Sequence, residues 1–314
     1  MKEDMNSIEY FAVPFNVTAM RIRDPRSLRF LRYFRDLKSL YISSGQINDL
    51  EELKMLHRLE ELTLFDIAVK DISAVWEMNQ LRSLYINECN DTISLSKLTE
   101  LRELTVVGGD LKPSEPLQEL VKIESLTLQA CNLKGIRFVS GMKRLRELNI
   151  ERNQVMDIGT LENLTVLENL VIATNNITDL SPLINLRNIH TLDISDNPIC
   201  WSHCDLSKLS CLPSVRELGL SWISVNAYQL HKARELRKIH FGGVECNDIS
   251  FLVNHPNVGK ISLYGSTVLD ISCLLTMPNL KSVWLSGNAF LKDDATVSKL
   301  RSSGVEVCES NSTT

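Results

Sequence analysis

Residues 167–187 read LENLVIATNNITDLSPLINLR and carry apolar side chains at a spacing that recurs along the chain. With Leu167 counted as position 0 of a repeat, positions 3 and 5 are Leu170 and Ile172. Apolar residues two positions apart indicate a short strand with one buried face. The apolar residues that follow predict a return segment packed behind that strand. The stretch therefore predicts one coil made of a strand and a return segment.

The apolar residues at positions 0, 3 and 5 recur in twelve copies, so that all 36 of these positions are apolar. The copies start at Leu37, Leu59, Leu81, Leu101, Ile123, Leu145, Leu167, Ile189, Val215, Leu236, Val258 and Leu280. Most starts are 22 residues apart, and a degenerate earlier copy starts at Val17. A fixed period of 20–50 residues is typical of stacked repeats. The sequence therefore predicts thirteen stacked coils.

Residues 175–183 have the pattern N-x-I-x-D-L-x-x-L, and together with the 22-residue period this resembles the leucine-rich repeat. The resemblance is to the class found in internalins and in the phosphatase-regulating SDS22 proteins, and it covers roughly residues 17–307. It implies an α/β fold: a curved, right-handed solenoid with a parallel sheet on its concave face and short 3-10, α or irregular segments on its convex face. The class is defined by its core, so it implies no particular activity.

The repeat register predicts one elongated domain over residues 1–314. Residues 1–36 form an N-terminal cap with the degenerate repeat, 37–288 the twelve repeats, 289–307 a C-terminal cap, and 308–314 a disordered tail. The C-terminal cap is expected because Asp293 and Asp294 precede a helical ATVSKLRSS segment, which Gly304 ends before a last edge strand. Terminal coils of a solenoid need such shielding.

A run of arginines marks the N-terminal coils. Residues 21–38 hold seven cations against two carboxylates, 7 − 2 = +5, while the whole chain has a net charge of −5. The cations are Arg21, Arg23, Arg26, Arg29, Arg32, Arg35 and Lys38. Leu28, Leu31, Phe34 and Leu37 keep the core spacing, so the cations are expected on the solvent side. This run is either a solubilising edge or a docking patch for an acidic partner.

Two polar positions repeat with the core and are assigned a structural task. Position 8 is Asn or Cys, and a side-chain amide there can satisfy backbone groups where the strand turns inward. Its members are Cys89, Cys131, Asn153, Asn175, Asn197 and Asn288. Position 12 is Asp, which suits the N-cap of a short return helix. Its members are Asp49, Asp71, Asp157, Asp179, Asp248 and Asp270. Neither set is expected to carry chemistry.

The one long repeat, from Ile189 to Ser214, contains an insertion at about 199–204 that reads ICWSHC. Cys200, His203 and Cys204 there could form part of a zinc site, but their irregular spacing fits no zinc motif and favours a protruding loop. We therefore expect no metal and no other cofactor. The eight cysteines have no framework spacing and are expected to be reduced thiols.

Charge and motifs restrict the function classes. A net charge of −5 argues against nucleic acid as a partner. The N-terminal stretch has neither a signal-peptide core nor a membrane span, so a cytoplasmic location is expected, with delivery by another secretion route left open. No phosphate-binding loop, nucleophile elbow, H-E-x-x-H or dinucleotide-binding motif occurs. We therefore expect a monomeric protein that is not an enzyme.

Function is then expected on outward positions of the strands, whose residue types the core does not dictate. Positions 2, 4, 6 and 7 are predicted to face outward, and large aromatic residues there are typical of interface hot spots. The candidate partner-binding residues are Tyr41, Phe65, Tyr85, Glu88, Glu151, Asp193, Trp222, His240, Tyr264 and Trp284. The aromatic members gather towards both ends of the expected concave face, which predicts two anchoring patches about 30–40 Å apart.

These residues predict a module that binds an unidentified partner protein through the concave face. The alternatives are an inhibitor or regulatory subunit that occludes an enzyme, such as a phosphatase regulator or a toxin antagonist, and a bacterial effector that binds a host protein. A purely structural role, in which each aromatic ring covers its neighbour's strand, also stays open.

Overall fold

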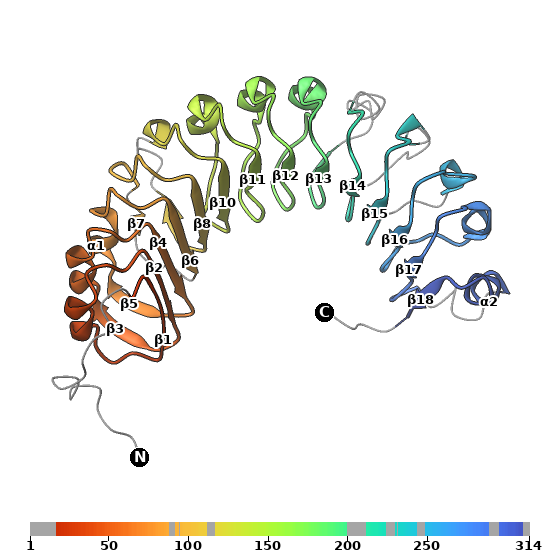
Figure 1. Ribbon diagram of the computed structural model, residues 1–314. Helices are drawn as coiled ribbons and strands as arrows, with labels where there is room; N and C mark the ends of the chain where they lie inside the picture. The colour runs from red at the N-terminus through yellow and green to blue at the C-terminus, as the bar shows by residue number, and fades with distance from the viewer. Residues whose placement is uncertain are drawn as a thin grey trace, which may run out of the picture. The chain divides into compact units, whose positions relative to one another are not determined.

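The computed structural model describes residues 17–87, 92–93, 95–111, 117–199, 212–223, 230, 232–243, 249–288 and 295–309. The chain divides into two compact units. The first contains Met1–Leu133 and Phe138–Leu145, and the second contains Lys134–Arg137 and Arg146–Thr314. Fourteen strands follow one parallel order along the chain, six in the first unit and eight in the second. Each unit is described in turn (Figure 1).

The first unit is built on six parallel strands, each of five residues. They are β1 (Ala19–Arg23), β2 (Ser39–Ser43), β4 (Glu61–Phe65), β6 (Ser83–Asn87), β8 (Glu103–Val107) and β10 (Ser125–Gln129). Equivalent repeat positions pair with one another, so that Leu40 lies opposite Leu62 and Leu62 lies opposite Leu84. Each inward side chain therefore meets its own copy in the neighbouring coil.

Two smaller parallel pairs lie just after the main strands of the first unit. They are β3 (Gln46–Asp49) with β5 (Ala68–Asp71), and β7 (Thr92–Ile93) with β9 (Asp110–Leu111). Neither pair was predicted from the sequence.

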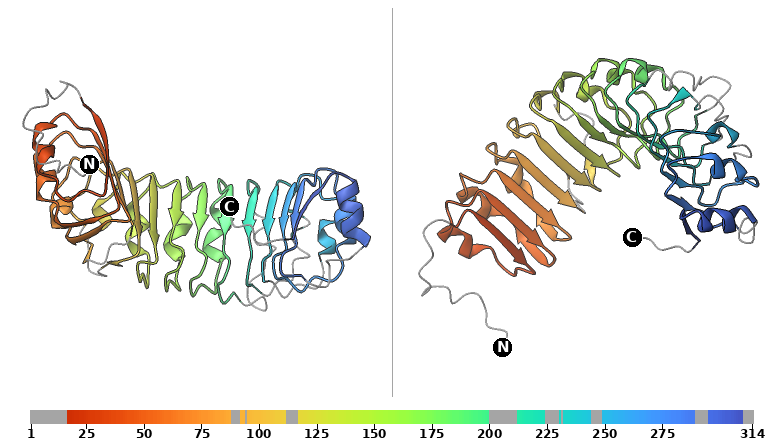
Figure 2. Two further views of the ribbon diagram at one scale, coloured as in Figure 1. Left: turned by 90° about the horizontal axis from the view of Figure 1, so that it is seen from below. Right: turned by 45° about the vertical axis from the view of Figure 1, so that its right-hand side comes forward.

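The second unit contains eight parallel strands of three residues each. They are β11 (Glu147–Asn149), β12 (Asn169–Val171), β13 (Thr191–Asp193), β14 (Glu217–Gly219), β15 (Lys238–His240), β16 (Lys260–Ser262), β17 (Ser282–Trp284) and β18 (Glu306–Cys308). The register again joins equal positions, as in Leu170 opposite Leu192. Figure 2 shows the strands of this unit lying side by side in chain order. The predicted C-terminal cap is present: α2 (Ala295–Ser302) is followed by Gly304 with φ +85° and then by β18, which pairs with β17.

The return segments of both units are short helices. They are η2 (Arg29–Tyr33), η3 (Glu51–Met55), α1 (Ser73–Trp76), η4 (Leu117–Glu119), η5 (Arg137–Gly141), η6 (Gly159–Asn163), η7 (Ser181–Asn185), η10 (Ser250–Leu252) and η11 (Ser272–Thr276). Within each unit these segments lie on the side opposite the strands (Figure 1). Among the described residues, none of the helices has the length and hydrophobicity that spanning a membrane requires.

The core consists of the repeated apolar positions. All 36 residues at positions 0, 3 and 5 are buried, with at most 9% of their surface exposed. The repeated apolar residues of the return segments are also buried, as in Leu50, Leu53 and Leu56. The predicted register is therefore confirmed in every repeat that it named.

The position-8 side chains act as a structural ladder, as predicted. The Asn175 amide nitrogen donates to the carbonyl oxygens of Ile150, Ile172 and Ala173 at 2.9–3.2 Å, and its Oδ1 accepts the Val155 N–H at 3.0 Å. Asn197 makes the same four contacts one coil later. In the first unit, Cys131 replaces the amide, and its Sγ lies 3.3–3.6 Å from three carbonyl oxygens. Cys89 lies outside the described residues.

The position-12 carboxylates also have the structural task that was expected, but one residue earlier than the N-cap. Oδ1 of Asp157, Asp179 and Asp270 accepts the N–H of the first helical residue two positions later, at 2.8 Å. The residue between them occupies the N-cap and has no side-chain cap. The N-cap assignment was therefore wrong by one residue, because the Asp closes an Asx turn before the helix begins. Asp248 lies outside the described residues.

Candidate functional site

The outward face of the strands carries the candidate site, and the backbone decides which positions belong to it. In the second unit the strands end at position 4, so position 6 already lies beyond them. Position 7 lies in a turn with left-handed backbone, with φ between 51° and 79°, in every repeat where the structure describes it. The prediction that position 7 faces outward on the strand was therefore wrong. Trp222, at that position, lies in the turn after β14.

The left-handed turn explains the residue types at position 7. Its members are Asp24, Ser44, Asp66, Gly108, Ala130, Arg152, Thr174, Asp196, Trp222, Gly243, Gly265 and Gly287. Gly and Asp account for most of them because these residues tolerate φ near +60°. Trp222 has φ 58° and the bulkiest side chain of the column. A bulky residue in this conformation indicates a local role that outweighs backbone preference.

The first unit has an aromatic patch on the outward face of β2, β4 and β6. We call Tyr41, Phe65 and Tyr85 the first aromatic patch. The Phe65 and Tyr85 rings lie 6.2 Å apart with 30° between their planes, and Phe65 is 41% exposed. The Arg21 guanidinium lies 5.5 Å from the centre of the Tyr41 ring. The structure therefore brings Phe65 and Tyr85 together, and places Tyr41 beside a cation.

The second unit has the other aromatic residues. We call Trp222, Tyr264 and Trp284 the second aromatic patch. Trp222 is 62% exposed and Tyr264 is 45% exposed, while Trp284 on β17 is half-buried. The Trp222 ring lies so close to Gly243 that a Cβ on that residue would overlap it. At Gly287 the fit is looser, because Cε2 of the Tyr264 ring lies 3.8 Å from the position that a Cβ would take, which is ordinary contact.

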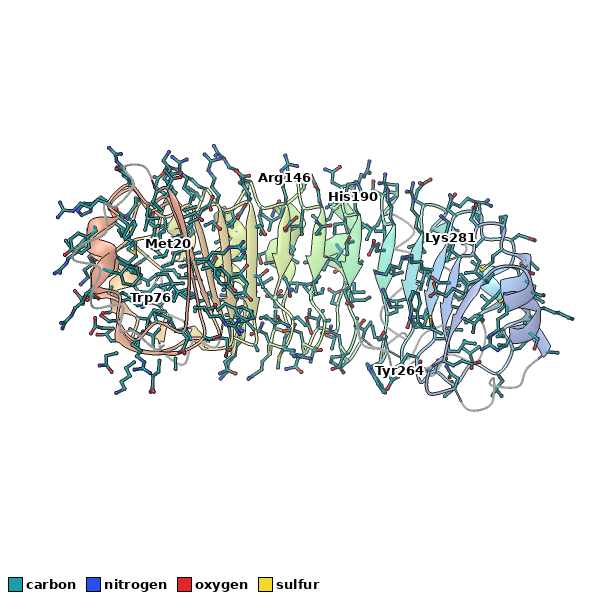
Figure 3. The ribbon with its side chains drawn as sticks, turned by 60° about the horizontal axis from the view of Figure 1, so that its bottom comes forward. Met20, Trp76, Arg146, His190, Tyr264 and Lys281 are labelled. Carbon is teal, nitrogen blue, oxygen red and sulfur yellow. The ribbon has the colours of Figure 1, made fainter. Side chains whose placement is uncertain are left out.

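Glycines thus lie beside two rings of the second aromatic patch, Gly243 at Trp222 and Gly287 at Tyr264, which sequence reasoning missed. Gly243, Gly265 and Gly287 recur every 22 residues at position 7, so the spacing was visible in the sequence. Because a glycine offers no side chain, each ring can lie against backbone and leave its other face in solvent. Figure 3 labels Tyr264 at this edge of the sheet.

The acidic candidates have local structural partners. The Asp193 carboxylate accepts the Ser195 N–H at 3.0 Å and lies where a side chain on Gly219 would clash. Glu151 is half-buried, and its backbone N–H donates to the Asn149 side chain at 2.9 Å. Glu88 lies outside the described residues.

His240 lies on β15, between β14 and β16, and is half-buried. Burial lowers the pKa of its imidazole below the usual value, and the Lys238 ammonium adds to the effect, while Asp193 and Glu217 oppose it. The ring is therefore held towards its neutral form and can donate and accept hydrogen bonds at the surface.

His255 is a second perturbed histidine and was not singled out from the sequence. It occupies a position, three residues before a repeat start, that holds Leu or Met in most other repeats, and it is buried. Its Nε2 lies 3.2 Å from the Ala233 carbonyl oxygen, and its Nδ1 has no hydrogen-bond partner. Burial lowers the pKa of this imidazole. The contacts point to a structural role in the core.

No group of His, Cys, Asp and Glu side chains among the described residues is arranged to hold a metal ion. The described cysteines, Cys131, Cys273 and Cys308, are free thiols. The insertion at about 199–204 that raised the zinc alternative lies, apart from Ile199, outside the described residues.

The N-terminal arginine run is exposed, as predicted. All seven cations between Arg21 and Lys38 are exposed, and within the described part of the chain none of them has a carboxylate within 4.0 Å. Asp36 pairs instead with Arg58 at 2.5 Å. The structure places this positive surface beside the first aromatic patch, through the Arg21–Tyr41 contact.

The comparisons with known proteins concern the whole fold. Neither a protein-family model nor a curated protein matches the sequence. An internalin (inlF) from Listeria monocytogenes has a similar structure, with a TM-score of 0.74 and 23% identity over 90% of this chain and 89% of that one. A leucine-rich repeat protein from Leptospira interrogans has a TM-score of 0.60 and 15% identity over 92% and 89%.

A plant protein is similar over part of its length. It is the leucine-rich repeat ectodomain of the membrane receptor kinase GASSHO1/SCHENGEN3 from Arabidopsis thaliana, with a TM-score of 0.60 and 16% identity. The match covers 85% of this chain and 34% of that one. Together with the parallel strands and the 22-residue register, these likenesses confirm that the chain has the leucine-rich repeat fold.

Proposed function

We propose that the chain is a non-enzymatic module that binds a partner protein through the outward face of its strands, the face expected to be concave, together with the left-handed turns that follow them. The observation that supports this most directly is Trp222. This residue is 62% exposed and its backbone has a left-handed conformation. Gly243 has no side chain and so leaves room for the indole ring. The core gains little from such an arrangement, whereas an exposed aromatic ring with a supported back face is typical of an interface hot spot.

The first aromatic patch supports the same proposal. Phe65 and Tyr85 contact each other on neighbouring strands, yet Phe65 keeps 41% of its surface in solvent. Exposed apolar surface of this kind contributes to affinity when a partner removes it from water. A protein with the same fold, the receptor kinase ectodomain from Arabidopsis, forms a complex with CASPARIAN STRIP INTEGRITY FACTOR 2.

The proposal is tested with single alanine variants of Tyr85, Trp222, Tyr264 and Trp284. Each variant is compared with the wild type in affinity capture of partners from the source cells and in thermal unfolding. We expect capture to fall at least about tenfold for Trp222→Ala, because hot-spot truncation costs about 2 kcal/mol or more. We expect Tm to fall by no more than about 4 °C, because the indole is already largely in water.

The matched control is Leu269→Ala. Leu269 is 63% exposed, nearly the same fraction as Trp222, but it lies at position 11 of its repeat, after the turn and away from the strand. Capture by this variant should equal that by the wild type. If the four aromatic variants lose thermal stability and keep their partner, the rings are structural and the proposal is wrong.

A further inference from the structure

Strands β14 to β17 carry exposed cations at the edge where the strands begin. We call Arg216, Arg237, Lys260 and Lys281 the cationic edge. All four are exposed, and none has a carboxylate within 4.0 Å in the part of the chain that the structure describes. Lys238, between them, pairs with Glu217 at 3.5 Å. Among the described residues, these four cations beside neighbouring strands are therefore not paired with a carboxylate.

The preceding strands of the same unit have the opposite charge. β11 to β13 and the residues that flank them carry five carboxylates and two cations. The carboxylates are Glu147, Glu151, Glu168, Asp193 and Asp196, and the cations Arg146 and Arg152 pair with Glu168 and Glu151. Counted with the residue before each strand and the turn after it, the net charge thus changes from negative on β12 and β13, through neutral on β14, to positive on β15 to β17. A binding partner for β14 to β17 should carry negative charge over a short distance, because a longer polyanion would meet the acidic strands.

The second aromatic patch lies at the opposite edge of these strands. In Figure 3, Lys281 and Tyr264 are labelled at opposite edges of the sheet. From position 1 to position 7 the distance is at most about 20 Å, the length at 3.3 Å per residue if the whole segment were extended, and β14 to β17 span about 14 Å at 4.8 Å per strand. This area of about 280 Å² is well below the roughly 800 Å² per partner of a typical folded interface. It suits a short extended segment.

We propose that this face binds a short acidic segment of a partner protein, with carboxylates on the cationic edge and an apolar or aromatic side chain on Trp222 and Tyr264. An extended segment advances about 3.3 Å per residue, so the carboxylates and the apolar anchor are about six residues apart. The half-buried His240 and the Ser262 side chain lie between the two edges and supply polar contacts. This inference rests on the proposed function and names the chemistry of the partner.

The test uses a random library of twelve-residue peptides displayed on phage and selected against the full chain. The best peptides are synthesised with a fluorescent label, and their dissociation constants are measured by anisotropy at two salt concentrations. We expect enrichment of Asp and Glu together with one Trp, Phe or Leu about six residues away. Arg237→Glu and Trp222→Ala should each weaken binding at least tenfold, and the weakening with salt should be smaller in Arg237→Glu.

The matched control is Arg144→Glu, the same charge reversal at an exposed residue before β11 of the same unit. It should change the dissociation constants less than twofold. A heparin fragment and a single-stranded oligonucleotide serve as competitors. The inference is overturned if the selected peptides are not acidic, or if Arg237→Glu binds them as well as Arg144→Glu does. It is also overturned if the heparin fragment or the oligonucleotide binds as tightly as the peptides and Trp222→Ala does not weaken the binding of the peptides.

Failure of this inference can be told apart from failure of the proposed function. If capture of a partner is lost with Tyr85→Ala but kept with Arg237→Glu, the acidic-segment proposal is wrong while the proposal of protein binding stands. If capture of a partner is kept in every one of these variants, both proposals are wrong.

Discussion

Asn175→Ala tests whether the position-8 ladder stabilises the second unit. The Asn175 side chain is buried, donates to three carbonyl oxygens and accepts the Val155 N–H. Alanine leaves that N–H buried without an acceptor and removes the donor shared by the three carbonyls. An unsatisfied buried group costs about 1–3 kcal/mol. With the N–H and at least one carbonyl affected, we expect a loss of about 3 kcal/mol in the free energy of unfolding.

The measurement is urea unfolding followed by circular dichroism and by tryptophan fluorescence. With a urea m-value of about 3 kcal/mol/M, the midpoint should fall by about 1 M. Using two probes is important because stacked repeats can open locally, and transitions that do not coincide would show it. The control is Asn175→Cys, since the Cys131 thiol already lies within 3.6 Å of three carbonyl oxygens at the equivalent position. We expect it to lose less than half as much. A midpoint for Asn175→Ala within about 0.2 M of the wild type, or a cysteine variant as unstable as the alanine variant, refutes the reasoning.

Three further predictions concern the turn, the buried histidine and the carboxylate caps. Gly243→Ala places a Cβ where the Trp222 ring lies and puts Ala at φ +62°. The free energy of unfolding, measured from the urea midpoint, should therefore fall by about 1–2 kcal/mol. An unchanged midpoint would contradict the packing of Trp222 on Gly243. For His255 the folded-state pKa lies below the usual 6.5, so stability is full above that value and falls as the pH drops from 6.5 through the folded pKa. His255→Leu should flatten the dependence of Tm on pH between 7 and 5, and an equal slope would count against burial as the cause. The Ser272 N–H holds the pKa of Asp270 below 3.8, so its stabilisation is present above pH 3.8 and is lost on further acidification. Asp270→Asn should remove that component from a Tm series between pH 5 and 2.5, whereas an unchanged series would contradict the cap.

The core was predictable because it follows from side-chain type at a fixed spacing. Leu170 and its equivalents have to be apolar to pack against their own copies, and every one of them is buried. The Asn175 ladder was also predictable, since one polar side chain among buried columns has to satisfy the backbone. The side chain decides the structure at these positions.

The remaining features depend on backbone geometry that side-chain type does not report. The left-handed turn at position 7 holds Ser44, Arg152 and Trp222 as well as glycines, so no single residue type marks it. The Asp179 carboxylate bonds two residues ahead, which sets the helix start one residue later than the cap pattern suggests. The pairing of Gly219 with Asp193, and of Gly243 with Trp222, joins adjacent coils and becomes visible only when they are stacked.

The left-handed turn has a consequence for how this surface changes over evolution. Position 4 lies on an ordinary strand, so almost any side chain can replace Tyr85, His240 or Trp284 there without altering the backbone. Position 7 admits a new side chain only at the cost of about 1–2 kcal/mol of backbone strain unless it is Gly, Asn or Asp. New partner specificities should therefore arise first through position 4, and a large residue at position 7, such as Trp222, should mark a contact that selection has kept.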